Sequence, residues 1–199
     1  FADMEDGERV LKEDATERLI EQRLPLGVVA AITPWNTPII MLALKLAPAL
    51  RAGNTVVVKP APTTPLSTLR LGELIADSIP PGVVNVIVDA NDLGDALTSH
   101  PDVAKVTFTG STATGRKVFA SAAAGLKRLT LELGGNDAAI VLDDMEPADA
   151  AQRIFGAAMM NAGQICLAPK RVYAPASLYD AICEEFASLA RQAVVGDGL

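Results

Sequence analysis

Cys166 is one of two cysteines in the 199-residue sequence, and it lies in the segment NAGQICLAPKR, residues 161–171. The glycine and proline of this segment predict a loop between a helix-like run and a strand-like run. A loop cysteine can act as a nucleophile once its thiol is deprotonated, whereas a lone cysteine is more often a small buried hydrophobic residue. The only histidine, His100, stands where a short helix ends before Pro101, so no histidine base is indicated. Both interpretations of Cys166 stay open on this segment alone.

Glu132 and Asn36 are two further side chains that could take part in chemistry at a carbonyl group. Glu132 stands between two leucines in LTLELGG, where we expect it to be partly buried and suited to general-base work near neutral pH. The alternative is a solvent-facing glutamate on an edge strand. Asn36, in TPWNTP, could donate its amide to a developing oxyanion, or it could simply cap the following helix.

The segment FTGSTATGRKV, residues 108–118, has the features of a phosphate site. A strand ends at Phe108, Gly110 allows a turn, and Ser111 or Thr112 caps a helix whose free N–H groups and dipole suit an anion. A plain capped helix would have the same pattern. Lys59 follows an apolar strand and could bind a ribose or a phosphate, or it could be a surface residue at the exit of the strand. The sequence has neither G-x-G-x-x-G nor a P-loop, the two common nucleotide-binding motifs.

Strand-like and helix-like runs alternate through the middle of the sequence. The expected strands cover 27–33, 54–60, 83–88, 104–110 and 127–135, and the expected helices cover 37–53, 65–79, 93–100 and 111–125. This alternation predicts an α/β fold in which helices flank a Rossmann-like parallel sheet. Such sheets bind ligands at the carboxyl ends of their strands, so we expect the candidate residues to converge on one edge.

The pattern restarts after residue 135, with strands at 138–142 and 171–175 and helices near 149–160 and 178–194. The first two dozen residues are charged, and 18–24 alternates loosely like an exposed strand. We therefore predict an arm-like segment over 1–24, a dinucleotide-binding domain over 25–135, and the beginning of a second α/β domain that bears the cysteine over 136–199.

Composition excludes several classes of protein. The net charge is −7, which argues against nucleic acid as a partner because phosphate binding needs a basic face. The most apolar run, 39–50, is far shorter than the roughly 20 residues of a membrane helix, and no signal-peptide pattern opens the sequence. The two cysteines are 17 residues apart in sequence and predict no metal site, and Cys183, at helical spacing from Phe186, is expected in the core. We expect a cytoplasmic protein without metal or membrane.

Six short motifs, PWNTP, VVVKPAPTTPLS, PPGVVNV, FTGSTATGRKV, LELGGND and GQICLA, follow one another in the sequence. In this order they resemble the aldehyde dehydrogenase superfamily from about residue 25 to residue 197. The resemblance implies an NAD(P)-dependent enzyme of the hydrolytic, non-acylating branch that acts on a small-molecule aldehyde. It also implies that the sequence is a central fragment, possessing little or no activity by itself, of a homodimer or homotetramer whose oligomerisation arm includes residues 1–24.

The resemblance also assigns roles to the three candidate catalytic residues. Cys166 becomes the nucleophile that attacks the aldehyde, and the oxyanion is held by the Asn36 amide and the backbone N–H of Cys166. Glu132 activates the water that hydrolyses the resulting thioester. Two alternatives remain, a cysteine hydrolase that cleaves activated esters and a non-catalytic relative with a structural or binding role.

For the cofactor, NAD or NADP, the resemblance implies that Lys59 contacts the adenosine ribose and that Gly110 and Ser111 form the pyrophosphate site. The full set of expected cofactor residues is Ile32, Thr33, Pro34, Trp35, Lys59, Ala61, Pro62, Gly94, Phe108, Thr109, Gly110, Ser111, Gly115 and Leu133. Pro62 departs from the family, since many NAD-using members have glutamate there. Because proline brings no carboxylate to repel a 2′-phosphate, we hypothesise that NADP is tolerated. The usual glycine-rich turn reads VDANDLG, in which only Gly94 matches.

Overall fold

The computed structural model describes residues 7–197 and divides the chain into two compact units, Phe1–Leu133 and Gly134–Leu199. Within residues 7–133, the first unit contains a five-stranded sheet, four helices and a separate hairpin. Within residues 134–197, the second contains two strands, two α-helices and one short 3-10 helix. Each unit has its own hydrophobic core, and each is described below by itself.

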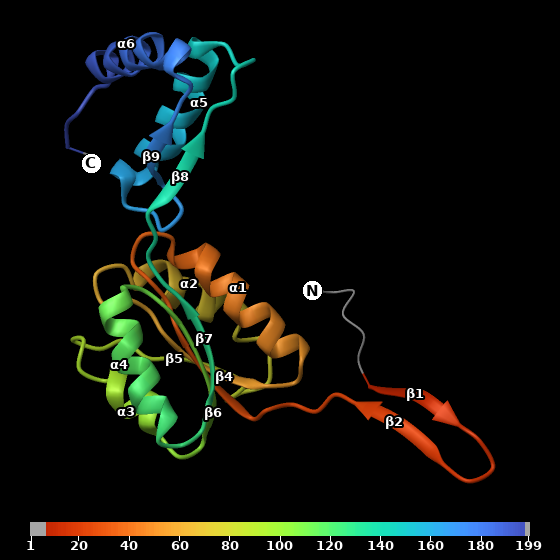
Figure 1. Cartoon of the computed structure of the whole chain (residues 1–199). Helices are drawn as coiled ribbons and strands as arrows, with labels where there is room; N and C mark the ends of the chain where they lie inside the picture. The colour runs from red at the N-terminus through yellow and green to blue at the C-terminus, as the bar shows by residue number, and fades with distance from the viewer. Residues whose placement is uncertain (1–6, 198–199) are drawn as a thin grey trace. The chain divides into compact units, whose positions relative to one another are not determined.

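Five parallel strands form the sheet of the first unit (Figure 1). They are β3 (Val28–Ile32), β4 (Thr55–Lys59), β5 (Val84–Val86), β6 (Val103–Thr109) and β7 (Arg128–Glu132). Their order is β5-β4-β3-β6-β7, with every pair parallel. The chain therefore builds outward from β3 to β5, then crosses back to place β6 on the other side of β3. Ligands bind such sheets at this point of reversal, beyond the carboxyl ends of the strands.

Helices cover both faces of the sheet because its central strands are apolar on both sides. Val29 and Ala31 of β3 pack with α1 (Pro38–Arg51) and α2 (Leu66–Ile75). Ala30 and Ile32, which alternate with them, pack on the opposite face with α3 (Gly94–Ser99) and α4 (Thr112–Ala123). The period of two along a strand sends neighbouring side chains to opposite faces. The predicted Rossmann-like α/β fold is confirmed.

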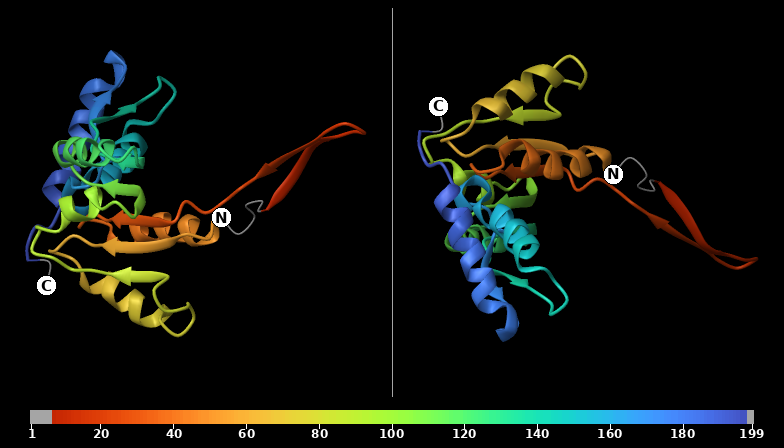
Figure 2. Two further views of the ribbon diagram at one scale, coloured as in Figure 1. Left: turned by 90° about the horizontal axis from the view of Figure 1, so that it is seen from below. Right: turned by 90° about the horizontal axis from the view of Figure 1, so that it is seen from above.

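An antiparallel hairpin precedes the sheet, formed by β1 (Glu8–Glu13) and β2 (Arg18–Gln22). Figure 2 shows it as a two-stranded ribbon joined by a tight turn. The exposed strand expected over 18–24 corresponds to β2, but β1 was not predicted. Its sequence, ERVLKE, lacks the alternation of apolar and polar residues by which strands are recognised. Both strands of the hairpin are largely exposed, so neither needs an apolar face.

The second unit is built around β8 (Asp137–Ile140) and β9 (Pro169–Tyr173), which pair in parallel. Helices α5 (Pro147–Met159) and α6 (Ala176–Gln192) pack together, and a 3-10 helix, η1 (Met160–Gly163), follows α5. The expectation that Cys183 lies in the core is wrong, because Cys183 is exposed and its neighbour Ile182 faces inward. The second α/β element pattern expected after residue 135 is present.

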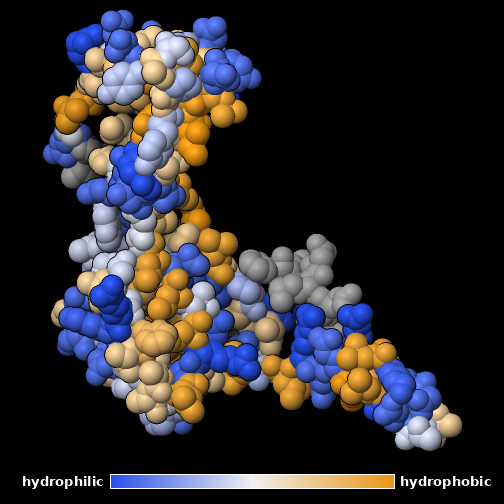
Figure 3. All heavy atoms as spheres, in the orientation of Figure 1, coloured by the Kyte–Doolittle hydropathy of each residue, from blue (hydrophilic) through white to orange (hydrophobic). Residues whose placement is uncertain are grey.

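Large apolar side chains also remain on the surface of both units, and Figure 3 shows such areas in orange in the orientation of Figure 1. The exposed apolar residues include Ile40 and Leu44 of α1 in the first unit and Ile140 and Leu142 in the second. Exposed apolar patches are typical of surfaces that contact other polypeptide segments. Among the described residues 7–197, no helix combines the length and apolar character needed to cross a membrane.

Candidate active site

Most of the predicted cofactor residues lie at or just beyond the carboxyl ends of the strands of the first unit, whereas Gly94 and Gly115 belong to α3 and α4. Two backbone hydrogen bonds tie these ends together. The Thr33 N–H donates to the Lys59 carbonyl at 3.0 Å, and the Gly110 N–H donates to the Glu132 carbonyl at 3.0 Å. The loops that leave β3, β4, β6 and β7 therefore start from one continuous edge of the sheet.

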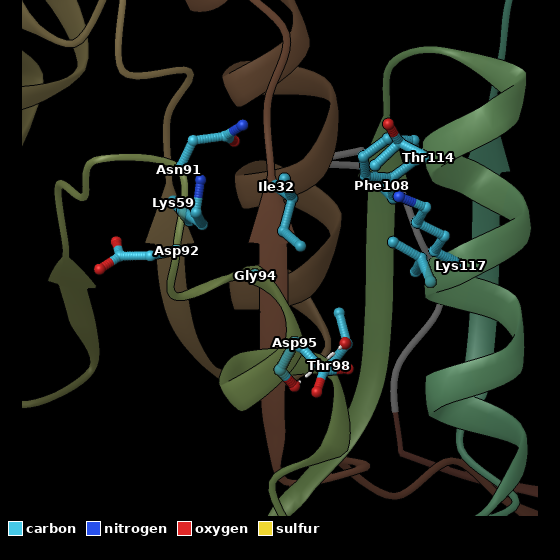
Figure 4. A pocket seen from close by; sticks show the side chains of 11 residues that line it. Ile32, Lys59, Asn91, Asp92, Gly94, Asp95, Thr98, Phe108, Thr114 and Lys117 are labelled. Atoms are coloured by element: carbon cyan, nitrogen blue, oxygen red, sulfur yellow. Dashed lines mark hydrogen bonds between the residues drawn. The ribbon is translucent and has the colours of Figure 1, made fainter.

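A cavity of about 450 Å³ opens at this edge, on the face that α3 and α4 cover (Figure 4). Figure 4 shows Ile32 at its centre, Lys59 and Asn91 on one side, and Thr114 and Lys117 of α4 on the other. The lining residues that the sequence singled out are Ile32, Lys59, Gly94 and Phe108. The lining residues that sequence reasoning missed are Asn91, Asp92, Asp95, Thr98, Thr114, Lys117 and Val118.

The N-terminus of α4 faces this cavity with a side-chain cap. The Ser111 hydroxyl accepts a hydrogen bond from the Thr114 N–H at 3.1 Å, as expected for an N-cap serine. Gly110 is required by close packing, because a Cβ atom there would lie 2.5 Å from the Phe108 ring. Gly115 is equally constrained, since a Cβ atom would lie 2.5 Å from a methyl group of Leu133. Glycine thus lets α4 approach the ends of β6 and β7 closely.

Lys59 forms a buried ion pair with Asp89, with 2.8 Å between Nζ and Oδ1. The Lys59 side chain is 6% exposed and that of Asp89 is fully buried, so the interpretation of Lys59 as a surface residue is wrong. The other Asp89 oxygen accepts a hydrogen bond from the Leu93 N–H at 3.0 Å. Burial acts to raise the pKa of Asp89, but the Lys59 ammonium and the backbone donors outweigh it and hold that pKa below its ordinary value.

The structure places the two other candidate polar residues of this unit in different surroundings. Asn36 is half-buried in the loop between β3 and α1. Glu132 is exposed, so the prediction of partial burial is wrong. The physical reason is that β7 is an edge strand and Glu132 is its last residue, so that within this unit nothing covers the carboxylate. Trp35 is also exposed, at 44%, which excludes a core position within the unit.

Lys45 is a buried cation that sequence reasoning missed. Its side chain lies on the opposite face of the sheet, where Nζ donates to the Thr107 hydroxyl at 3.1 Å. Burial lowers the pKa of Lys45 to about 8, while the negative charge of Glu132 acts to raise it and Lys105 to lower it. The signal in the sequence is spacing, because Lys45 lies three residues after Leu42 and therefore on the apolar face of α1.

Cys166 lies in the second unit, in the loop between η1 and β9. Three successive residues before it, Asn161, Ala162 and Gly163, have left-handed backbone angles with φ of 51°, 55° and 77°. The thiol is exposed, so the interpretation as a buried hydrophobic residue is wrong. Lys170 donates to the Ala168 carbonyl at 3.2 Å and ties the loop to β9.

The structure therefore places most of the expected cofactor residues at one sheet edge, and four of the expected residues, Ile32, Lys59, Gly94 and Phe108, line the cavity there. Asn36 lies on a loop of the same unit and Glu132 at the end of one of its strands. Cys166 belongs to the other unit. No group of three or more histidine, cysteine, aspartate or glutamate side chains with the geometry of a metal site occurs among residues 7–197.

The strand ends also have polar atoms that suit a bound dinucleotide. The hydroxyl oxygens of Thr33 and Thr109 are buried at the ends of β3 and β6 and have no hydrogen-bond partner within the described part of the chain. A capped helix N-terminus, a lysine and the adjoining cavity complete the set. These groups are the donors and the space that a sugar–phosphate ligand requires.

A doubly wound parallel sheet with a cavity at its point of reversal defines the class of nucleotide-binding α/β proteins. The sequence model of the aldehyde dehydrogenase family matches residues 1–199, and the chain belongs to that family.

Relatives with known names agree with this assignment. The chain is 47% identical over 191 residues to the phenylacetaldehyde dehydrogenase of Pseudomonas fluorescens, covering 95% of the chain and 38% of the relative. It is 43% identical to the NADP(+) succinate-semialdehyde dehydrogenase of Escherichia coli strain K12, covering 97% of the chain and 40% of that protein. The chain thus spans about two fifths of the length of these curated relatives.

Solved structures share the fold. A mutant of aldehyde dehydrogenase C from Pseudomonas syringae, crystallised with NAD+ and octanal, superimposes with a TM-score of 0.85 and 40% sequence identity. The match covers 88% of this chain and 37% of that one.

Proposed function

We propose that the full-length protein oxidises an aldehyde to a carboxylic acid, with NAD or NADP as the hydride acceptor. The observation that carries the proposal is an exposed cysteine on a tightly turned loop in a member of the aldehyde dehydrogenase family. An exposed thiol can reach a substrate, whereas a buried one is chemically inert.

The cofactor would bind at the carboxyl edge of the first unit. Its phosphates would meet the N-terminus of α4, which Ser111 caps, and its adenosine would occupy the cavity between Lys59 and Lys117. The chemistry that a bound nicotinamide dinucleotide supplies is acceptance of a hydride. The chain's own residues would hold and orient this ligand.

Cys166 would attack the carbonyl carbon as a thiolate, forming a C–S bond and an oxyanion. The Asn36 amide and the backbone N–H of Cys166 would donate hydrogen bonds to that oxyanion. Loss of a hydride from the same carbon leaves a thioester on Cys166. The thiol proton would leave to Glu132 or to solvent before the attack.

Glu132 would then take a proton from water as that water attacks the thioester. The C–S bond breaks, the acid is released, and the Cys166 thiolate is restored. An exposed carboxylate at the end of an edge strand is accessible to water, which this step requires. Lys45, whose charge attracts Glu132, would help to position it.

We further propose that the protein forms a homodimer or homotetramer in the cytosol. The hairpin of β1 and β2 exposes Val10, Leu11, Leu19 and Ile20, and such apolar side chains on an exposed ribbon suit contact with a second subunit. Both cysteines are free and exposed, which suits a reducing compartment.

The test is a panel of aldehydes with NAD and NADP, assayed by the absorbance of the reduced cofactor in the full-length protein. Cys166→Ala should abolish turnover, whereas Cys183→Ala, which removes the other exposed thiol, should leave it unchanged. Glu132→Gln should preserve one rapid turnover and slow the following ones, because only thioester hydrolysis needs the carboxylate. Ester cleavage without cofactor reduction would instead identify a cysteine hydrolase, and inactivity toward every aldehyde would contradict the proposal.

A further inference from the structure

The buried pair of Lys59 and Asp89 determines the charge at one end of the nucleotide cavity. Lys59 lines the cavity, whereas Asp89 lies behind it, fully buried, with Oδ1 2.8 Å from the Lys59 Nζ. The positive charge that Lys59 presents to a ligand is therefore already matched by a carboxylate that water does not reach. A buried charge pair is screened much less than an exposed one.

The backbone holds Asp89 in this position. Its second oxygen accepts from the Leu93 N–H at 3.0 Å, and Asn91, between these two residues, has a left-handed φ of 72°. Rotation of the carboxylate away from Lys59 would break a buried ion pair, which is costly.

The remaining charges of the cavity do not restore a positive potential. Its lining has the cation Lys117 on α4 and the carboxylates Asp92 and Asp95 on the opposite loop and helix. With Lys59 neutralised by Asp89, the lining presents one unmatched cation and two carboxylates. A phosphate monoester, with a charge of about −1.5 to −2, would be repelled more strongly than a neutral hydroxyl group at the same place.

We infer that Asp89 makes the cavity selective for an adenosine with a free 2′-hydroxyl, that is for NAD over NADP. This inference rests on the proposed function, because it names the cofactor of that same site. Asp89 acts through Lys59 and is therefore a positioning residue. The inference predicts the opposite preference to the hypothesis based on Pro62, because the negative charge that is absent at Pro62 is present on the loop after β5.

Direct binding tests the inference without requiring turnover. Calorimetry on the full-length protein would compare 5′-AMP with adenosine 2′,5′-bisphosphate, which differ only in the 2′-phosphate. The wild-type protein should bind 5′-AMP more tightly. In Asp89→Asn, which keeps the shape and removes the charge, the ratio of bisphosphate to 5′-AMP affinity should rise by about 10-fold or more.

Two further variants control for loss of folding and for the removal of a negative charge outside the cavity. Asp89→Ser removes the same charge with a smaller side chain and should shift the ratio in the same direction if Asp89→Asn does not fold. Asp102→Asn removes an exposed carboxylate that does not line the cavity and should leave the ratio unchanged. Because the ratio compares two ligands on one sample, partial loss of folded protein does not alter it.

The inference is overturned if the wild-type protein binds the bisphosphate as tightly as 5′-AMP, or if neither Asp89 variant changes the ratio. If binding shows the expected preference but no aldehyde is oxidised, the proposed function fails and the nucleotide selectivity stands. If aldehydes are oxidised with equal kcat/KM for NAD and NADP, the selectivity fails and the proposed function stands.

Discussion

Replacing Lys45 by methionine should stabilise the folded protein near neutral pH and lose that effect in alkali. The Lys45 side chain is 7% exposed, and its pKa falls from 10.5 to about 8, because burial disfavours the ammonium more than the Glu132 charge favours it. Folding therefore opposes the charged form of Lys45, and methionine fills a similar volume without a charge.

The magnitude follows from proton linkage. At about 1.4 kcal/mol per pH unit, the difference between 10.5 and about 8 amounts to on the order of 3 kcal/mol of unfolding free energy. Loss of the hydrogen bond to Thr107 subtracts about 1 kcal/mol, so we expect a net gain of about 2 kcal/mol. Between about pH 8 and about pH 10.5 the unfolded state binds more protons than the folded state, so the wild-type protein becomes more stable as pH rises and the gain disappears.

The assay is thermal unfolding of the full-length protein, followed by circular dichroism from about pH 6.5 to about pH 10. Lys45→Met should raise Tm by a few degrees near about pH 7, and the increase should shrink steadily above about pH 8. Lys117→Met, at an exposed position, is the control and should show a pH-independent difference. A lower Tm for Lys45→Met at neutral pH, or an increase that does not change with pH, would refute the reasoning.

Three other predictions concern glycine, capping and backbone strain. Gly115→Ala should lower the unfolding free energy by about 1–3 kcal/mol through overpacking, whereas Gly156→Ala, where a Cβ atom meets nothing within 4 Å, should be neutral or slightly stabilising in urea titrations. Ser111→Ala removes the cap of α4 and should cost about 1 kcal/mol while raising the Kd for 5′-AMP in calorimetry; an unchanged Kd would exclude a role for the cap in binding. Ala162→Gly should raise Tm by relieving a left-handed backbone, and a lower Tm would show that the strain is not significant.

Much of the fold followed from local patterns. Apolar runs of strand length alternated with amphipathic helices, and short connections left a parallel sheet as the consistent arrangement. A capped helix start at Ser111 or Thr112, after the glycine turn, was also recognisable, because capping is a property of a few neighbouring residues. The structure decided that Ser111 is the cap. The same reasoning found the loop of Cys166 from its glycine and proline.

Burial at the ends of the sheet was not predictable in the same way. Glu132 stands between two leucines, which suggested burial, but it is the last residue of an edge strand and is exposed. Cys183 has helical spacing from Phe186, yet Ile182 is the inward-facing residue. Exposure depends on which strand is outermost and on how a helix is rotated, and both are set by packing between distant segments.

The sequence by itself determined the α/β alternation, the ordered motifs and the chemical identity of the candidate residues, because these depend on residues close together in the chain. Only the tertiary structure decided that Asp89 neutralises Lys59 and that Lys45 is a buried cation. Asp89 lies 30 residues from Lys59 in the sequence, and Lys45 lies 62 residues from its hydrogen-bond partner Thr107. Polar groups so far apart along the chain become partners only when the parallel strands align and the helices pack over the sheet.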